Sequence, residues 1–280
     1  MGISQTLSSS FVVEGIGLHS GQPVRVEVRP AVIPQGRVFY RDGVAIPALT
    51  DFVVDTRRCT TLGRDGQTVG TVEHLLAALM LAGIDHADII VDGPELPALD
   101  GCAQRWSAEI AAAGVCRGEV EIPSINIVEP QWIVDGESQF FLLPADDLLL
   151  YAAVSIPDTI ATQMLAGGAL TRPEVREQLL RARTYGLASE VAALLEAGLA
   201  LGGTLDNAVV LTNDGYLNPN VWPEEPAWHK VLDLLGDLAL TGARLTGQIL
   251  AVRGGHRSHV ALAARLRQQC PACARHACPC

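Results

Sequence analysis

Residues 228–240, WHKVLDLLGDLAL, decide the fold of the second half of the chain. His229, Asp233 and Asp237 follow one another at intervals of four residues and therefore line one face of a helix. Leucine and valine occupy most of the remaining circumference, so this helix is expected to be buried. Burying an imidazole with two carboxylates is costly unless they hydrogen-bond one another or hold a metal. On this helix alone, a satisfied His–Asp pair in a core and a metal site both stay open.

A second apolar helix is predicted from Thr71, the expected N-cap, because apolar residues then recur at helical spacing. Glu73 and His74 stand side by side at its start and point about 100° apart. One of them can therefore bind a metal while the other faces a ligand. Taken alone, such a pair more often forms a solvated first turn, and it lacks the His-Glu-x-x-His spacing of zinc proteases.

Three glycine-containing segments each hold a histidine or an arginine: GIGLHSG (15–21), ARTYG (182–186) and GGH (254–256). Glycine allows close approach of the backbone to a ligand, and His256 can titrate near neutral pH. His259 lies three residues further on and is expected to face solvent on the last helix. Each segment alone is a weak signal, because glycine-rich turns with a histidine are common.

The pattern along the chain predicts two α+β domains of similar size, each a β-sheet layer covered by helices. In the first half, residues 24–28 and 87–91 are predicted strands and 102–113 a helix. The second half repeats this plan, with strands near 125–134, 138–143, 148–154, 207–212 and 248–252. Pro123 lies in the expected linker, which gives domains 1–121 and 122–269 followed by a cysteine-rich tail, 270–280.

Composition narrows the class of protein. The 280 residues carry a net charge of −11, which argues against nucleic acid as a partner. The longest apolar run, residues 75–84, is half of the roughly 20 residues that a membrane-spanning helix needs. The N-terminus has no basic stretch before a long apolar core, so no signal peptide is expected. Scattered single thiols also suit a reducing compartment, and a cytoplasmic protein is predicted.

The tail contains enough soft ligands for a closed zinc site: Cys270, Cys273, His276, Cys278 and Cys280. The spacing of its second half is tighter than in ordinary zinc fingers. A disordered, reducible terminus is therefore slightly favoured over a second metal site, with membrane anchoring through acylated cysteines as a third alternative. In either main case the tail is expected to lie outside the catalytic machinery.

The motifs match one family in order and spacing. The chain resembles the UDP-3-O-acyl-N-acetylglucosamine deacetylases, zinc enzymes of lipid A biosynthesis. The resemblance runs from about residue 11 to 266 and is carried by GIGLHSG, DTRRCTTL, TVEHLLAAL, PELPALDG, ARTYG, GGTLDNAVV, HKVLDLLGD and GGH. It implies a β-α-α-β sandwich with the active site between the two domains, and hydrolysis of the substrate's N-acetyl group with release of acetate.

The resemblance also implies a role for each matching residue. The Zn²⁺ ligands would be His74, His229 and Asp233, an open set of the kind that catalytic zinc sites use. The catalytic residues would be Glu73 as general base, His256 as proton donor, Asp237 as its orienting carboxylate, and Thr184 at the oxyanion. The substrate-binding residues would be Lys230 and Arg253 at the diphosphate and sugar, His19 near the nucleotide, and Tyr185, Leu187 and Val191 along an acyl passage whose helix covers 188–198.

Some positions depart from the family pattern. Tyr185 and Leu187 stand where the family has two phenylalanines, and Arg253 where it generally has lysine. These changes put the substrate in question more than the chemistry, so an unacylated or differently acylated sugar nucleotide is the alternative. A non-catalytic binding homologue is less favoured, because every catalytic residue type is present. The expected partner is a small acylated UDP-sugar, with transient contact to the inner membrane surface through that lipid; the sequence sets neither acyl length nor oligomeric state.

Overall fold

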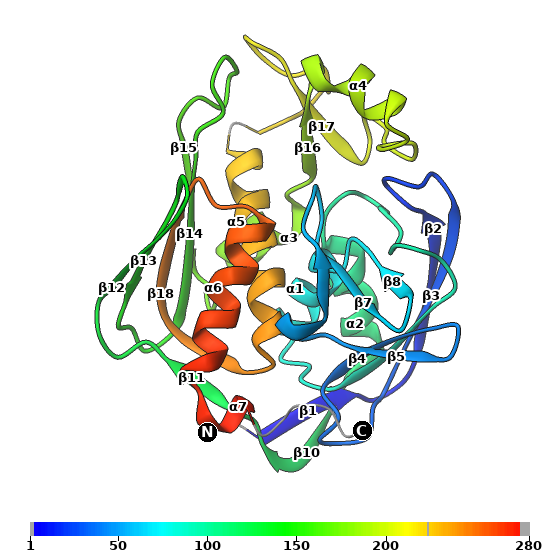
Figure 1. The fold of residues 1–280 in the computed structure, drawn as a ribbon, viewed down its shortest axis with the longest axis vertical. Helices are drawn as coiled ribbons and strands as arrows, with labels where there is room; N and C mark the ends of the chain where they lie inside the picture. The colour runs from blue at the N-terminus through cyan, green and yellow to red at the C-terminus, as the bar shows by residue number, and fades with distance from the viewer. Residues whose placement is uncertain (1–2, 223, 275–280) are drawn as a thin grey trace.

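The computed structural model describes residues 3–222 and 224–274. Two β-sheets form the outer layers of the molecule, one from each half of the chain, and helices fill the space between them (Figure 1). The layer order is β-α-α-β. This architecture confirms the two-domain α+β fold class that the sequence predicts.

The N-terminal sheet contains five strands in the order β2 (Phe11–Ile16), β3 (Pro23–Arg29), β9 (Ala87–Val91), β4 (Arg37–Arg41) and β5 (Val44–Pro47). Its strands pair antiparallel except β9 and β4, which are parallel. Val24, Val26 and Val28 of β3 are buried and alternate with more exposed charged residues. The apolar face of this sheet therefore packs on the helices and its charged face points outward.

The C-terminal sheet has the order β12 (Gln131–Asp135), β13 (Ser138–Leu143), β18 (Arg244–Val252), β14 (Leu148–Val154) and β15 (Met164–Ala169), with β11 (Ser124–Asn126) pairing in parallel with β18. Only β18 and β14 pair in parallel along this path. The two sheets thus have the same strand order and the same directions. The succession of strands and helices that repeats along the sequence therefore corresponds to a sheet topology that repeats in the structure.

Helices occupy matching places in the two halves. α1 (Glu73–Leu81) precedes β9, as α5 (Glu225–Leu238) precedes β18, and α2 (Gln104–Ala113) follows β9, as α6 (His256–Gln268) follows β18. α1 and α5 pack against each other in the interior. The expected N-cap of α1 is wrong by one residue, because Thr71 has a positive φ of 55° and Val72 precedes the helix.

Two additions extend the sandwich. The first is a three-stranded sheet before α1, made of β6 (Val53–Asp55), β7 (Thr61–Arg64) and β8 (Gln67–Val69). The second follows α3 (Pro173–Arg181) and contains β16 (Thr184–Leu187), η2 (Ala188–Glu190), α4 (Val191–Glu196) and β17 (Ala208–Leu211). It stands at the top of Figure 1, beyond the two main sheets. The remaining short elements are β1 (Ile3–Leu7), which pairs with β10 (Val115–Glu121), the 3-10 turns η1 (Thr50–Phe52) and η3 (Ala239–Thr241), and α7 (Pro271–Ala274).

The first part of the cysteine-rich tail belongs to the core. Cys270, directly before α7, and Cys273, within α7, are 7% and 1% exposed and lie within the main hydrophobic cluster. The expectation of a disordered terminus is therefore wrong for these two thiols, because they are packed against apolar side chains. His276, Cys278 and Cys280 lie outside the described residues. Among the residues that are described, no helix combines the length and the apolar character needed to cross a membrane.

Candidate active site

The site is built where α1 meets α5. Gly236 of α5 lies directly against the backbone of Glu73, so that a Cβ at this position would overlap the Glu73 carbonyl oxygen. Glycine is required here because any side chain would push the two helices apart. The close approach places the start of α1 beside the middle of α5, and with it the side chains that both helices carry.

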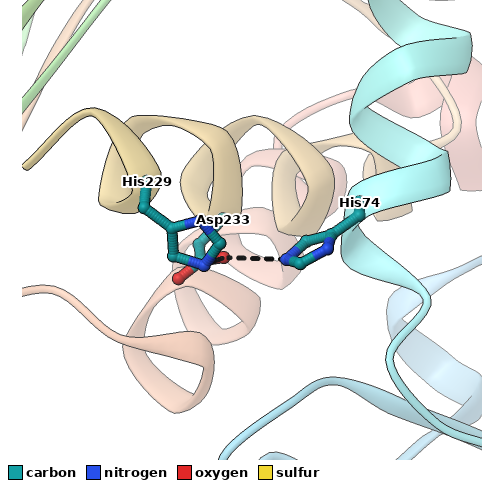
Figure 2. A group of neighbouring side chains, drawn as sticks. All are labelled: His74, His229 and Asp233. Atoms are coloured by element: carbon teal, nitrogen blue, oxygen red, sulfur yellow. Dashed lines mark ion pairs between the residues drawn. The ribbon is translucent and has the colours of Figure 1, made fainter. Parts of the chain in front are cut away.

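His74, His229 and Asp233 form a buried group whose ligand atoms all lie within 4.8 Å of one another. Nε2 of His229 lies 3.2 Å and Nε2 of His74 lies 3.9 Å from Oδ1 of Asp233. Figure 2 shows the two imidazoles converging on this carboxylate from α1 and α5. A second group of three overlaps the first, because Asp233 also lies near Glu73 and His256.

The donor atoms suit a zinc ion. Oδ1 of Asp233 is buried yet accepts no hydrogen bond from any described residue. Nδ1 of His229 lies 3.0 Å from the carbonyl oxygen of Ala182, which can only accept, so Nδ1 carries the proton and Nε2 presents its lone pair to the group. Burial, assisted by neighbouring His229, lowers the pKa of His74 to about 3, so His74 is neutral, as a metal ligand must be. The three residues therefore fit Zn²⁺.

Glu73 is buried at the start of α1, and its Oε2 accepts a hydrogen bond from the backbone N–H of Thr60 at 3.0 Å. Burial raises the pKa of Glu73 to about 7, although the nearby His256 opposes this shift. Its Oε1 lies 3.9 Å from Nε2 of His256. Glu73 can thus accept a proton near neutral pH, which suits the role of general base that the family resemblance implies for it.

His256 begins α6 and is held by Asp237, whose Oδ2 lies 3.0 Å from the Nδ1 of the imidazole. The hydroxyl of Thr60 donates to Oδ1 of the same carboxylate at 2.5 Å. Burial would lower the pKa of His256, but the negative charges around it, first of all that of Asp237, outweigh burial and raise the pKa to about 9. His256 is therefore protonated at neutral pH and can donate a proton.

His259 does not face solvent as the sequence suggests. It is 1% exposed, and its Nδ1 lies 3.1 Å from Oδ2 of Asp237. Because α6 begins at His256, position 259 falls one turn later on the same side of the helix and points into the same buried carboxylate. Asp237 thus has three partners, of which the sequence predicts only His256.

Lys230 lies at the mouth of the site. Its Nζ contacts Oδ2 of Asp233 at 2.6 Å and stands 5.1 Å from the ring centroid of Tyr185. Lys230, Tyr185 and Arg253 line one cavity of about 410 Å³. Three residues that the sequence expects to bind substrate are therefore gathered at one entrance. Burial would raise the pKa of Asp233, but His229 and Lys230 hold it well below its usual range.

Thr184, Leu187 and Val191 run along β16 and the start of α4. The Thr184 backbone N–H donates to the Gly101 carbonyl at 2.7 Å, and its neighbour Tyr185 packs edge-on against the His229 ring. Leu187 packs on a small apolar cluster around Val209. The Thr184 hydroxyl makes no hydrogen bond with the described residues.

The loop that contains His19 is fixed by Glu95, which the sequence analysis leaves without a role. Oε1 of Glu95 accepts hydrogen bonds from the backbone N–H groups of His19 and Ser20 and from the Ser20 hydroxyl. Both ring nitrogens of His19 are buried without a hydrogen-bond partner among the described residues. Burial lowers the pKa of His19. The charge of Glu95 opposes this shift, and the charges of Arg58 and His256 add to it. The sequence signal for this contact is the glutamate of the PELPALDG motif, Glu95, which is flanked by apolar residues and prolines.

The chain matches one protein family over residues 4–268, the UDP-3-O-acyl N-acetylglycosamine deacetylases. It is 38% identical to the UDP-3-O-acyl-N-acetylglucosamine deacetylase of Leptospira biflexa serovar Patoc, over 95% of this chain and 90% of that protein. It is 40% identical to the enzyme of the same name from Thermosynechococcus vestitus, over 95% and 94% of the two chains. For the Myxococcus xanthus enzyme the identity is 39% over 90% and 82%. Because the family match spans residues 4–268 and these relatives are 38–40% identical over at least 90% of the chain, the chain belongs to the UDP-3-O-acyl-N-acetylglucosamine deacetylase family.

Proposed function

We propose that this protein removes the N-acetyl group of a UDP-3-O-acyl-N-acetylglucosamine by zinc-dependent hydrolysis, releasing acetate, as the committed step of lipid A biosynthesis. One observation carries the proposal. A buried His-His-Asp group with an unpaired carboxylate oxygen lies beside a glutamate whose pKa is near 7 and a histidine whose pKa is near 9. Hydrolysis of an amide needs these three functions in one place.

His74, His229 and Asp233 would hold the zinc ion. When bound, zinc polarises the amide carbonyl and lowers the pKa of water towards neutrality. The support for these ligands is the convergence of their donor atoms and the fixed tautomer of His229. The hydrogen bond from Nδ1 of His229 to Ala182 orients the ring before any metal arrives, which reduces the cost of forming the site.

Glu73 and His256 would move the protons. Glu73, ionised above pH 7, takes a proton from the attacking water, and His256, protonated below pH 9, gives one to the departing amine nitrogen. The new C–O bond forms first and gives a tetrahedral oxyanion, and the amide C–N bond then breaks, leaving acetate and a free amine. Asp237 keeps the imidazole of His256 oriented through Nδ1, so that Nε2 faces the reacting bond.

The sugar nucleotide would be held at the entrance by positive charge. Lys230 and Arg253 line the cavity next to Asp233, and both can bind the diphosphate. His19 would lie near the nucleotide, on the loop clamped by Glu95. Thr184, directly before Tyr185, would donate its hydroxyl to the developing oxyanion.

The acyl chain would follow β16 and α4. Tyr185 and Leu187 pack on the apolar cluster of Ala161, Val209 and Leu211, and Val191 begins α4. Leu195 of α4 and Leu201 after it add apolar surface to this segment, with 48% and 53% exposure. We infer that the protein works in the cytoplasm and touches the inner membrane surface only transiently, through this segment and its lipid substrate.

Mass spectrometry of reaction products tests the proposal. The zinc-loaded protein is incubated separately with UDP-N-acetylglucosamine and with its 3-O-acyl derivatives of several chain lengths. Loss of one acetyl group from an acylated substrate, with a kcat/KM at least tenfold above that of the unacylated one, is expected. Preferential deacetylation of the unacylated compound would make this a deacetylase of simpler sugar nucleotides. If the zinc-loaded protein forms product from neither compound, the protein is a non-catalytic homologue and the proposal is wrong.

A further inference from the structure

A second cavity lies away from the catalytic group. Its volume is about 540 Å³, within the roughly 300–1,000 Å³ of small-molecule sites. It opens along the seam between the two halves of the chain, beside Met80 and Leu81 at the end of α1 and Ile122 and Pro123 in the linker. None of its lining residues belongs to the metal group or to the proposed substrate cavity.

The charge of this cavity is opposite to that of the whole protein. Within the part of the chain that the structure describes, four arginines and one carboxylate, that of Asp85, line the cavity. This lining has an excess of three positive charges, while the chain has a net charge of −11. The arginines are Arg37, Arg176, Arg244 and Arg267. Asp85 is already bound to Arg244, with Nη2 and Oδ2 separated by 2.7 Å. The other three arginines form no ion pair with a carboxylate among the described residues.

The guanidinium groups retain unused hydrogen-bond donors. Arg37 donates from Nε to the carbonyl of Ile84 at 2.9 Å and from Nη1 to that of Ala239 at 3.2 Å, which leaves its Nη2 without a partner among the described residues. Among the described residues Arg267 donates only from Nη1, to the carbonyl of Thr241. Burial lowers the pKa of Arg37, and Arg244 lowers it further against the attraction of Asp85. An anion in the cavity would offset this cost of burying positive charge.

The lining also has an apolar part. This aliphatic part comes from both sheets and from both central helices: Val38, Met80, Leu148, Leu170, Leu235 and Leu245. A simple inorganic anion would pair with the arginine charges but would leave this apolar surface in contact with water. An uncharged lipid would cover the apolar surface and leave the arginines unpaired. Only a molecule with both parts satisfies the whole lining.

We propose that this seam cavity is a second ligand site, which binds an amphipathic anion consisting of an acyl chain with a carboxylate or phosphate head. The head is bound by Arg37, Arg176 and Arg267, because guanidinium groups bind both kinds of head through paired N–H groups. The chain lies against the aliphatic part. Arg37 reaches from β4 to η3 and Arg176 from α3 to α1, so an occupied cavity ties the two halves together.

Calorimetric titration with decanoate tests the proposal. The protein is the zinc-loaded Val191→Glu variant, in which a carboxylate in the proposed acyl passage disfavours binding there. One equivalent of decanoate is expected to bind, and decyl phosphate should bind as well. Acetate, which can reach a zinc ion but has no chain, and 1-decanol, which has no charge, should each bind at least tenfold more weakly. The temperature of unfolding should rise with decanoate concentration.

Two substitutions in the same background assign the binding to the seam cavity. Arg176→Gln removes an exposed charge and should weaken decanoate binding at least fivefold. Ala45→Phe fills the cavity from β5 and should weaken it more than tenfold. The matched control is Arg172→Gln, an exposed arginine four residues from Arg176 that pairs with Glu174 outside the cavity, and it should leave the affinity within twofold.

The proposal is wrong if decanoate fails to bind the Val191→Glu protein, or if Arg176→Gln and Ala45→Phe both bind it like the control. If 1-decanol binds as tightly as decanoate, the cavity recognises only the apolar chain and the proposal is wrong. If acetate binds as tightly as decanoate, the cavity recognises only the charge, which also contradicts the proposal. Deacetylation by a protein that carries Arg176→Gln alone, with Val191 kept, should match that of the unaltered protein. The outcome is therefore independent of the proposed reaction.

Discussion

Nδ1 of His256 and Nδ1 of His259 lie 3.0 and 3.1 Å from the same carboxylate oxygen, Oδ2 of Asp237. The pKa values of the two histidines are nevertheless shifted in opposite directions. Burial lowers the pKa of both. Around His256 the charges of Asp237, Asp233 and Glu73 together outweigh burial and raise the pKa to about 9, whereas around His259 the attraction of Asp237 does not outweigh it and the pKa is lowered. At neutral pH His256 is thus charged and His259 is neutral.

This difference assigns separate roles to the two histidines. His256→Gln should lower kcat by about 10²–10⁴-fold, the usual contribution of a positioned proton donor. His259→Gln keeps an N–H donor for Asp237 and should lower kcat less than tenfold. Both variants are compared at equal zinc content by their initial rates. A larger loss in His259→Gln than in His256→Gln would reverse the two roles.

The pH profile of kcat/KM should be bell-shaped. Glu73 accepts a proton only when ionised, so the rate rises as pH increases through about 7, and His256 donates only when protonated, so the rate falls as pH increases through about 9. In Glu73→Gln the residual rate should lack the acid limb while bound zinc is unchanged. An acid limb that survives this substitution would assign it to another group.

The sequence predicts the helices that carry the candidate site residues, which the structure brings together, but it does not predict their supporting contacts. Periodicity identifies the helices of His74 and His229, and the family motifs supply their roles. Thr60, by contrast, meets Asp237 across 177 positions of the chain, and Glu95 meets Ser20 across 75, so no local pattern marks either contact. The burial of His259 depends on where α6 begins, and a difference of one or two residues changes the face on which a side chain lies.

The shared topology of the two sheets shows the same limit. Local sequence patterns predict β3, β9, β12, β13, β14 and β18 of these sheets but not β2, β4, β5 or β15, and the order in which the strands pair depends on long-range packing that no local pattern encodes. For the cysteine-rich tail, composition predicts too much separation from the fold. Its composition suggests a separate segment, yet Cys270 and Cys273 are small apolar side chains of the core. The proposed boundaries at residues 121 and 269 stay predictions.

Gly236→Ala should disturb the site through the backbone. A Cβ at this position overlaps the Glu73 carbonyl, so α1 must move away from α5, and such overpacking typically costs about 1–3 kcal/mol of the free energy of unfolding. Activity should fall with stability because Glu73 and His74 move together. Gly215→Ala, where a Cβ meets only the Thr212 hydroxyl at 3.9 Å, is the control. Urea unfolding measures both, and equal stability of the two variants would show that the helices tolerate the added methyl group.

Lys230→Ala should raise KM more than it lowers kcat, because a residue that grips the diphosphate binds the ground state and the transition state alike. Its place at the cavity mouth beside Tyr185 supports this expectation. The control is Arg257→Ala, which removes an exposed positive charge that pairs with Asp135 outside that cavity. Steady-state kinetics separates the two parameters. A fall in kcat at constant KM would put the ammonium group at the reacting bond.

Zinc content tests most directly whether His74, His229 and Asp233 form the metal centre. The protein is prepared with its chain ending at Ala274, so that His276, Cys278 and Cys280 cannot contribute ligands, and is dialysed against zinc-free buffer before elemental analysis. The unaltered site and Glu73→Gln should each retain about one equivalent of zinc per chain, since catalytic sites bind it through three protein ligands. His229→Ala should retain little zinc and no deacetylase activity. A full equivalent in the His229→Ala protein would contradict the assigned centre.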